Sequence, residues 1–142
     1  MVCLYGTIFF IIIDRLLKVL ALKLGYAKVL IGPWLKFSLV KNNNAAFSLN
    51  FKFDIVWLSI IITIAALIWL NYSLKKKDYL KSLALAMLCL GAMSNIYDRF
   101  VYGAVIDYFN FANLNVFNLA DILIVLAAII LLWQEFRNQK KT

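Results

Sequence analysis

Two aspartates in the C-terminal third of the chain are the strongest candidates for chemistry. Asp107 lies in VIDYF between apolar and aromatic residues, where no local structure requires an acid, and Asp121 lies in FNLAD at the start of a long apolar stretch. If the chain between them folds back, the two carboxyls can approach each other. Carboxylates about 3 Å apart in a low-dielectric site cannot both ionise, so they share one proton. Such a pair can polarise a carbonyl with one acid while the other takes a proton from an attacking water, as in aspartic proteases.

Asp121 also has a simpler structural interpretation. Asn118 precedes it by three residues, so Asn118 at the N-cap and Asp121 at the third helical position would form a capping box, stabilised by the helix dipole. Taken alone, an acid in this position is more often a cap than a catalyst. Asp107 has no comparable structural explanation.

Other polar residues interrupt apolar stretches at helical spacing. Asn95 and Asp98 share a helix face at i and i+3 beside Arg99, and the structural alternative is an interface anchor or a polar bridge between helices. Asp14 and Lys18 are four residues apart with the acid first, the better order for a helical ion pair. A local salt bridge is the structural alternative here, because a charge at the middle of a span costs about 2.5–3.5 kcal/mol.

The composition is that of an integral membrane protein. Of the 142 residues, 65% are hydrophobic and 15% are charged, and the mean hydropathy is +0.86, outside the range of soluble domains. A bilayer core about 30 Å thick requires about 20 largely apolar residues per helix. The sequence therefore predicts an all-α integral membrane protein, a single domain over 1–142, with four transmembrane helices at about 2–24, 54–73, 82–100 and 117–134.

The distribution of basic residues predicts the orientation of these spans. They crowd the connection between spans two and three and follow span four, at Lys75, Lys76, Lys77, Lys81, Arg137, Lys140 and Lys141. With four spans, both regions and the N-terminus lie on one side, which the positive-inside rule makes cytoplasmic. We interpret the first span as retained and not as a cleaved signal peptide, because no basic residue precedes it and no A-x-A site interrupts it.

The two connections on the opposite side differ in kind. Apolar and polar residues alternate over Leu35–Val40, and an asparagine run follows it, so we predict a small extracytoplasmic β-sheet within about 25–53. Residues 101–116 mix aromatic residues with Asn and Gly, which predicts a short interfacial loop between spans three and four, on the same face.

The residue inventory excludes several kinds of site. Histidine is absent, which excludes HExxH metalloproteases, His-based triads and His-ligated metal sites. Cys3 and Cys89 form no CxxC pair and are expected to be small buried residues. In a membrane protein, the net charge of +8 at pH 7 bears on topology and not on nucleic-acid binding.

Five short motifs, in order along the chain, resemble those of the lipoprotein signal peptidases, the bacterial signal peptidase II family. DRLLK (14–18) is similar to the family's first-span motif, NNNAAFS (42–48) to NxGAAF, GAMSNIYDR (91–99) to GGxxGNxxDR, VIDYF (105–109) to VVDF, and FNLAD (117–121) to FNxAD. Each motif alone is weak. Five in order, with the same number of spans, resemble this family specifically.

The resemblance implies a four-span aspartyl endopeptidase of the bacterial inner membrane, with cytoplasmic termini and a site at the extracytoplasmic face. Asp107 and Asp121 are the implied catalytic pair, and a supporting set lines or braces the site: Asp14, Lys18, Asn42, Asn95, Asp98, Arg99 and Asn118. The implied substrate is a prolipoprotein whose lipobox Cys carries diacylglyceryl, cut just before that Cys. No metal, organic cofactor or nucleic-acid partner is implied, and we expect a monomer in contact with membrane lipid.

Three residues depart from the family motifs. Asn44, Leu90 and Ser94 stand where the motifs have glycine. Asn tolerates positive φ, so we expect the loop at Asn44 to survive. Leu90 and Ser94 widen a helix face where small residues allow close approach, so we expect them to affect the packing of span three.

Two other classes of function are open from the residues alone. A four-span transporter that uses acids as proton relays would carry an acid near the midplane of a span. Apart from Asp14, however, the acids in or next to the spans lie near one face. A structural or assembly subunit would explain the capping residues but would leave Asp107 without a reason.

Overall fold

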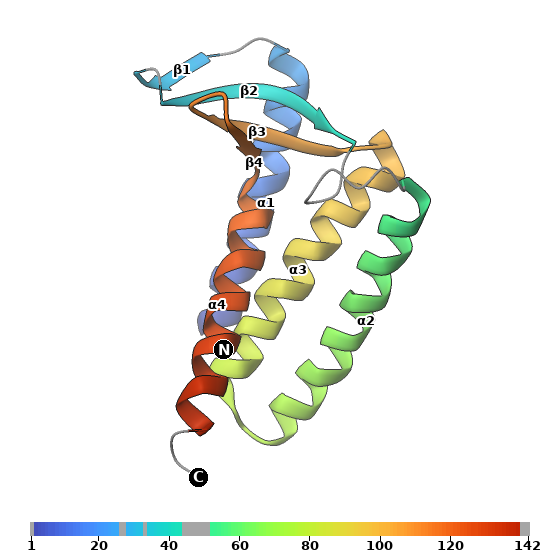
Figure 1. Cartoon of the computed structure of the whole chain (residues 1–142), viewed down its shortest axis with the longest axis vertical. Coiled ribbons are helices and arrows are strands. Elements are labelled where there is room, and N and C mark those ends of the chain that lie inside the picture. Colours follow the sequence, from blue (N-terminus) through green and yellow to red (C-terminus); the bar gives the residue numbers. More distant parts are fainter. Residues whose placement is uncertain (1, 26–27, 33, 44–51, 140–142) are drawn as a thin grey trace.

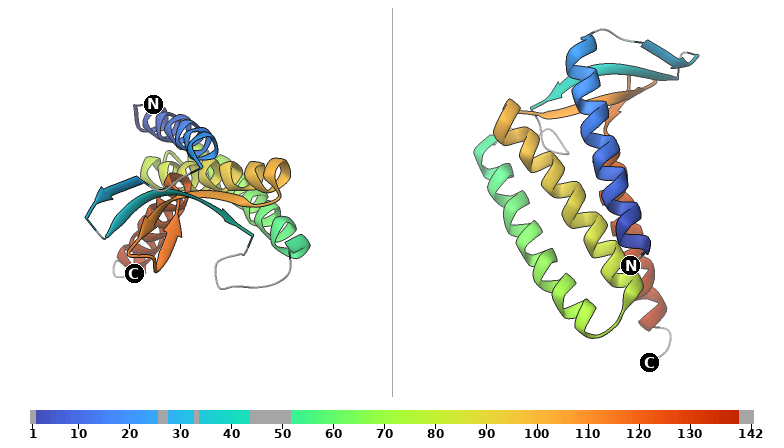
Figure 2. Two further views of the ribbon diagram at one scale, coloured as in Figure 1. Left: turned by 90° about the horizontal axis from the view of Figure 1, so that it is seen from above. Right: turned by 180° about the vertical axis from the view of Figure 1, so that it is seen from behind.

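The described residues form four helices and a four-stranded sheet that lies across one end of the helical bundle (Figure 1). They are residues 2–25, 28–32, 34–43 and 52–139 of a computed structural model. The helices are α1 (Val2–Leu24), α2 (Lys52–Lys75), α3 (Tyr79–Tyr102) and α4 (Leu119–Gln139), and the strands are β1 (Lys28–Ile31), β2 (Leu35–Asn42), β3 (Val105–Phe111) and β4 (Asn115–Phe117). α1 begins and α4 ends at the end of the bundle away from the sheet (Figure 2).

The helix ends follow from local sequence. α3 begins after Asp78, whose side chain accepts a hydrogen bond from the backbone N–H of Lys81 at 3.1 Å. It ends at Gly103, whose φ of 71° is accessible to glycine without a steric penalty. α2 begins at Lys52.

α3 is the central helix of the bundle, in contact with α1, α2 and α4. On one side Ala84 and Met87 pack against Ala127 of α4, and on another side Leu85 packs against Ala66 of α2. Small residues at these contacts allow the backbones to approach closely, which is the usual basis of helix association in membranes.

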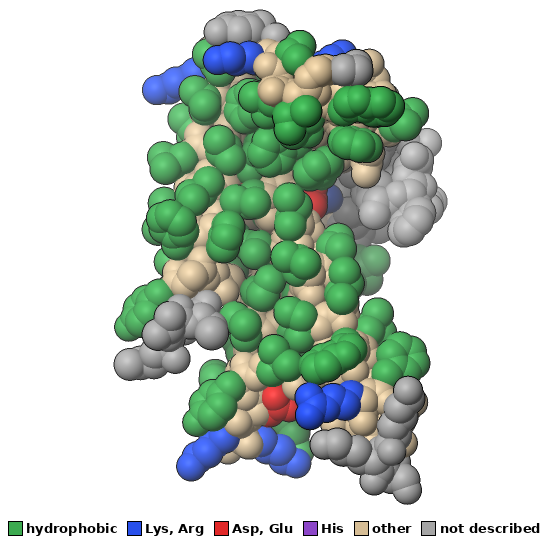
Figure 3. All heavy atoms as spheres, turned by 90° about the vertical axis from the view of Figure 1, so that its left-hand side faces the viewer, with side chains coloured by type: hydrophobic (Ala, Val, Ile, Leu, Met, Phe, Trp, Pro, Cys, Tyr) green, Lys and Arg blue, Asp and Glu red, His purple; other side chains and the backbone are tan. Residues whose placement is uncertain are grey.

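The outer surface of the bundle is apolar, as a bilayer requires. On the face that Figure 3 shows, hydrophobic side chains cover most of the middle of the molecule, and Lys and Arg gather toward its two ends. Among the described residues, three helices are long and apolar enough to cross a membrane, over Val56–Lys75, Tyr79–Tyr102 and Leu119–Gln139. α1 is as long as the others but carries Asp14, Arg15 and Lys18 within its apolar sequence.

The sheet is larger than the sequence predicted. The strand expected around Leu35–Val40 is confirmed as β2, which lies between β1 and β3 in an antiparallel sheet of order β1-β2-β3-β4. The prediction of an interfacial loop over 101–116 is wrong, because this segment contains β3, a turn and β4. The fold is mostly helical with a small antiparallel sheet, as predicted, but the β region is not confined to about 25–53.

The physical reason is the burial of β3 on both of its faces. Successive side chains of a strand point to opposite faces, so a half-exposed strand alternates between apolar and polar residues. The four residues from Val105 to Tyr108 are all buried, and a strand buried on both faces shows no such alternation. The departure at Asn44 falls within 44–51, which lies outside the described residues.

α3 approaches α4 most tightly at Gly91. A Cβ atom at Gly91 would lie 2.8 Å from the backbone oxygen of Ala120 and 2.9 Å from Cγ1 of Ile124. These distances are shorter than ordinary contacts, so the two helices pack at this separation because residue 91 has no side chain. Leu90 beside it is half-buried, and the close approach is kept despite the substitution there.

We expect Gly91→Ala to destabilise the protein by about 1–3 kcal/mol, the usual effect of overpacking. Gly6→Ala is the matched control: nothing lies within 4 Å of a Cβ at that position of α1, and alanine is the better helix former. Thermal unfolding of both variants in detergent micelles measures the difference. Equal stability of the two variants would show that the α3–α4 contact has room for a methyl group.

Candidate active site

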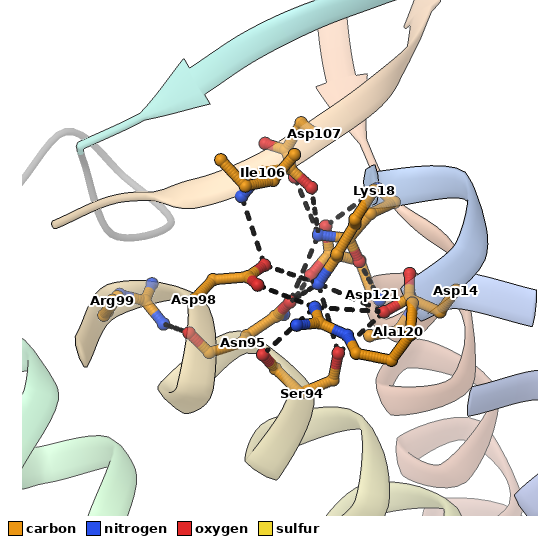
Figure 4. A network of polar contacts seen from close by, with 12 residues as sticks. Asp14, Lys18, Ser94, Asn95, Asp98, Arg99, Ile106, Asp107, Ala120 and Asp121 are labelled. Carbon is orange, nitrogen blue, oxygen red and sulfur yellow. Dashed lines mark hydrogen bonds and ion pairs between the residues drawn. The ribbon is translucent and has the colours of Figure 1, made fainter. Parts of the chain in front are cut away.

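Polar side chains converge where the sheet meets α1, the end of α3 and the start of α4 (Figure 4). The predicted site residues that bond to one another there are Asp14, Lys18, Asn42, Asn95, Asp98, Asp107, Asn118 and Asp121. Arg99 lies at the edge of this cluster. Its Nη1 donates to the backbone oxygen of Asn95 at 3.5 Å, and its charge interacts with Asp107 and Asp121. The structure thus brings together all of the site residues predicted from the sequence.

Asn118 links the two carboxyls that the sequence singled out. Its Nδ2 donates to Oδ1 of Asp107 at 2.8 Å, and its Oδ1 accepts from the backbone N–H of Asp121 at 2.9 Å. The backbone N–H of Asn118 donates in turn to Oδ2 of Asp121 at 3.2 Å. The predicted capping box is therefore confirmed, and Asp121 is a helix cap as well as a member of the polar cluster.

Two more asparagines hold the remaining carboxyl oxygens. Asn42, at the end of β2, donates to Oδ2 of Asp107 at 2.9 Å, and Asn95 of α3 donates to Oδ1 of Asp121 at 2.7 Å. Each of the four oxygens thus accepts one N–H, and a carboxylate oxygen has a second acceptor position. No hydrogen bond between described residues joins the two carboxyls directly, and among the described residues each oxygen keeps one acceptor position that a proton or a water can take.

Below this pair lies a cluster of two acids and two bases, in which Arg15 is partly exposed and the other three side chains are buried. Lys18 Nζ lies 3.1 Å from Asp14 Oδ2 and 2.6 Å from Asp98 Oδ2, and these three side chains are at most 1% exposed. Arg15 Nη2 lies 2.6 Å from Asp98 Oδ1 and 3.7 Å from Asp14 Oδ2. The predicted Asp14–Lys18 pair is confirmed, but it is one part of a network that joins α1 to α3.

The charged cluster also orients the amide of Asn95. Lys18 Nζ donates to Asn95 Oδ1 at 3.1 Å, and Asn118 Nδ2 donates to the same oxygen at 3.1 Å. Because two donors converge on this oxygen, the NH₂ group of Asn95 must point the other way, toward Asp121. The ion pairs therefore act on the carboxyl pair through an amide of fixed orientation.

Sequence reasoning missed three members of the network. Arg15 stands next to Asp14, and its charge inside an apolar stretch was an available signal. Ser94 Oγ donates to Asp14 Oδ2 at 2.7 Å and accepts from Lys18 Nζ at 3.2 Å, so this departure from the family motif adds a hydroxyl to the network. The hydroxyl of Tyr108 donates to Asp14 Oδ1 at 3.0 Å. A serine in a span and a tyrosine near an interface carry no distinctive pattern.

Burial changes the acidity of Asp107, which lies in β3 outside the membrane-spanning helices. Removal from water raises the pKa of this carboxyl to about 6, because burial penalises the charged form. The hydrogen bond from Asn42 opposes the rise, the negative charge of Asp121 adds to it, and the hydrogen bond from Asn118 opposes it. Asp107 therefore keeps its proton to a higher pH than an ordinary aspartic acid.

The site offers no grouping typical of a bound metal. Within the part of the chain that the structure describes, no three His, Cys, Asp or Glu side chains are placed to hold one ion. The acids of the cluster are occupied by ammonium, guanidinium, hydroxyl and amide donors instead.

The site thus consists of a carboxyl pair held by amide donors at one end of an apolar helical bundle. Comparison with known proteins specifies the family. The family model described as Signal peptidase (SPase) II matches residues 7–137. The chain is 36% identical over 105 residues to the lipoprotein signal peptidase of Moorella thermoacetica, covering 73% of this chain and 70% of that protein. The lipoprotein signal peptidase of Chlamydia pneumoniae is 31% identical over 150 residues, covering 94% and 89%.

Two solved structures, each described as a bacterial membrane enzyme structure, have the same fold. One superposes with a TM-score of 0.84 at 23% identity and covers 99% of this chain and 91% of that one. The other has a TM-score of 0.75 at 26% identity and covers 94% and 91%. The chain belongs to the signal peptidase II family. It is a bacterial membrane protein and an aspartic peptidase that removes the signal peptide from prolipoproteins.

The raised pKa of Asp107 predicts a pH-dependent stability. The pKa rises from 3.8 to about 6 on folding, so the contribution of this carboxyl to stability is complete below about pH 4 and is lost as the pH rises through about 6. The loss amounts to about 3 kcal/mol. The stability of Asp107→Asn minus that of the unmodified protein should therefore be larger at about pH 8 than at about pH 4. Thermal unfolding at both pH values measures this; a stability difference that does not change with pH would contradict it.

Proposed function

We propose that Asp107 and Asp121 are the catalytic pair of this peptidase, and that it cuts diacylglyceryl-modified prolipoproteins immediately before the lipidated Cys. The observation that carries the proposal is the bridge through Asn118, which bonds to Asp107 with its amide nitrogen and to Asp121 with its amide oxygen and backbone N–H. One residue therefore sets the separation of two carboxyls that come from a strand and from a helix.

The pair performs acid–base chemistry on a water molecule. Two buried carboxyls in electrostatic contact hold one proton between them and titrate as a unit. The ionised carboxyl removes a proton from the water as its oxygen attacks the scissile carbonyl carbon, and the protonated carboxyl donates to the carbonyl oxygen. When the tetrahedral intermediate collapses, the carboxyl that took the proton from water passes it to the amide nitrogen of the lipidated Cys, and the C–N bond breaks. The other carboxyl takes a proton back from the diol, so the signal peptide leaves with a carboxyl end and the Cys with a free amine.

The other polar residues support this pair in distinct ways. Asn42, Asn95 and Asn118 orient the carboxyl oxygens through single amide bonds. The ion cluster around Lys18 places Asn95, and Arg99 adds a positive charge at the edge of the site. Asn118 and Asn95 also bond to each other, so the supporting amides form one connected network.

The location of the acids argues against the transporter alternative. A proton relay requires an acid partway through the membrane, and Asp14 was the candidate in the sequence. The side chain of Asp14 instead contacts Ser94, Tyr108 and the first turn of α4, next to the carboxyl pair. The acid that stood apart in the sequence therefore belongs to the same cluster at the sheet end of the bundle.

We expect Asp107→Asn and Asp121→Asn each to lower prolipoprotein cleavage by about 10²–10⁴-fold, because each variant removes one member of an acid–base pair. The assay is cleavage of a lipidated prolipoprotein by the purified variants in detergent. The control is Asp78→Asn, at the N-cap of α3, since asparagine caps a helix as well as aspartate does. Cleavage at the unmodified rate by either site variant, with the folded state verified by thermal unfolding, would overturn the assignment.

The same proposal covers the arrangement in the membrane. We propose that all four helices span the bilayer, with the sheet outside and both termini in the cytoplasm of a bacterial inner membrane. Asp14 and Lys18 of α1 are buried inside the protein, whereas large apolar side chains such as Phe9, Ile12 and Leu16 are exposed on the outer surface of this helix. The lysine-rich α2–α3 connection lies at the end away from the sheet, as the positive-inside rule requires of a cytoplasmic side (Figure 1). One chain supplies the whole polar cluster, which suits a monomer surrounded by lipid.

Thiol labelling tests this orientation. In a background with Cys3 and Cys89 replaced by alanine, single cysteines are introduced at Lys76, in the α2–α3 connection, and at Asn113, in the turn between β3 and β4. A membrane-impermeant maleimide applied to intact cells should label Asn113→Cys alone, and both positions should react after lysis. Labelling of Lys76→Cys in intact cells would show that the orientation or the number of spans is wrong.

A further inference from the structure

The first turn of α4 has its backbone donors satisfied from three different elements. The N–H groups at the start of a helix have no partner within the helix and need acceptors from elsewhere. The N–H of Leu119 donates to the hydroxyl of Tyr108 at 2.9 Å, that of Ala120 to Asp14 Oδ1 at 3.3 Å, and that of Asp121 to Asn118 Oδ1 at 2.9 Å. Only the last of these bonds comes from the capping box. Tyr108 of β3 and Asp14 of α1 complete the cap by tertiary contacts.

Tyr108 is held at both of its ends. The side chain is 0% exposed, and its ring packs against Phe37 and Phe109 with centroid separations of 5.6 Å and 4.8 Å. Its hydroxyl donates to Asp14 Oδ1 at 3.0 Å while accepting from the N–H of Leu119. Burial and the charge of Asp14 raise the pKa of the phenol well above its ordinary value. The hydroxyl therefore keeps its proton and remains a donor.

The position of Tyr108 in the chain lets its hydroxyl influence the relative position of the two carboxyls. Tyr108 directly follows Asp107 in β3, and Leu119 precedes Asp121 by two residues in α4. The bond between Tyr108 and Leu119 therefore ties the strand that carries one carboxyl to the helix turn that carries the other. The bridge through Asn118 is the second such tie. Reacting groups in an active site must be held within about 0.5 Å of their productive geometry, which two ties achieve better than one.

We propose that Tyr108 is a positioning residue of the peptidase site, whose hydroxyl, between Asp14 and the N-terminus of α4, sets the place of Asp121 relative to Asp107. The inference rests on the proposed catalytic pair. It assigns Tyr108 no contact with the substrate and no proton transfer in the reaction. Its effect is on the geometry of the transition state and not on substrate affinity.

The test compares Tyr108→Phe, which removes one oxygen atom and keeps the ring, with Tyr79→Phe. Tyr79 is 76% exposed and lies at the start of α3, whereas the site residues of α3 lie near the other end of this helix. Three quantities are measured on purified protein in detergent: kcat and KM for a lipidated prolipoprotein, the concentration of active sites, and the inhibition constant of a lipopeptide with a statine-type hydroxyl in place of the scissile carbonyl. Such a hydroxyl mimics the tetrahedral intermediate, so its affinity follows transition-state stabilisation.

For Tyr108→Phe we expect kcat per active site to fall about three- to tenfold, the effect of losing one hydrogen bond, while KM stays within about twofold. The inhibition constant should rise by the same factor as kcat falls, and Tyr79→Phe should match the unmodified protein. A merely structural role would lower the number of active sites and leave the inhibition constant unchanged, which would overturn the proposal. Unchanged kcat in Tyr108→Phe would also overturn it. Neither result would contradict the assignment of the catalytic pair. That assignment is overturned only if Asp107→Asn or Asp121→Asn still cleaves the prolipoprotein at the unmodified rate.

Discussion

The ammonium group of Lys18 is surrounded by protein, and its compensation by Asp14 and Asp98 is the constraint on which the rest of the site depends. A buried ion costs several kcal/mol of desolvation, and removal of one partner from a buried pair typically costs about 3–5 kcal/mol. α1 and α3 must therefore meet with these side chains in register, or the charges are left unpaired. Arg15 brings the cluster to two acids and two bases, so its formal charges cancel.

The neutral cluster supports a pair of carboxyls for which the described part of the chain provides no direct ion pair. Asp107 and Asp121 receive single amide bonds from asparagines, which fix their oxygens without supplying a full positive charge. Amide donors favour a carboxylate less than an ammonium group does, so burial prevails at Asp107 and raises its pKa to about 6. Because the paired charges of the Lys18 cluster are kept separate from Asp107 and Asp121, these two carboxyls remain able to hold a proton.

The start of α4 and strand β3 hold the carboxyl pair apart from the charged cluster. α4 begins at the site, so its first turn supplies N–H groups that order Asn118 and Asp14. β3 supplies Asp107 and Tyr108 from adjacent positions, one bonded to the amides and the other to the helix end. A buried strand beside a helix N-terminus offers fixed backbone geometry on both sides of the carboxyl pair, which a loop at the membrane surface would not.

The amino-acid sequence by itself determined the class of protein, the positions of the helices and the identity of the chemical groups. Apolar length locates a helix because each membrane-spanning segment must satisfy its own backbone hydrogen bonds and face lipid. An acidic residue in such an apolar segment stands out because a charge in the bilayer is costly. The capping box of Asn118 and Asp121 and the Asp14–Lys18 pair were also predictable, because both connect residues three or four positions apart.

Only the tertiary structure decided how these groups meet. β3 has no alternating pattern because both of its faces are buried, so the sequence predicted a loop where the structure has a strand. The contacts of Lys18 with Asp98 and of Tyr108 with Leu119 join residues far apart along the chain. Their partners are chosen by the packing of whole elements, and a local pattern in one segment carries no information about which distant segment will lie against it.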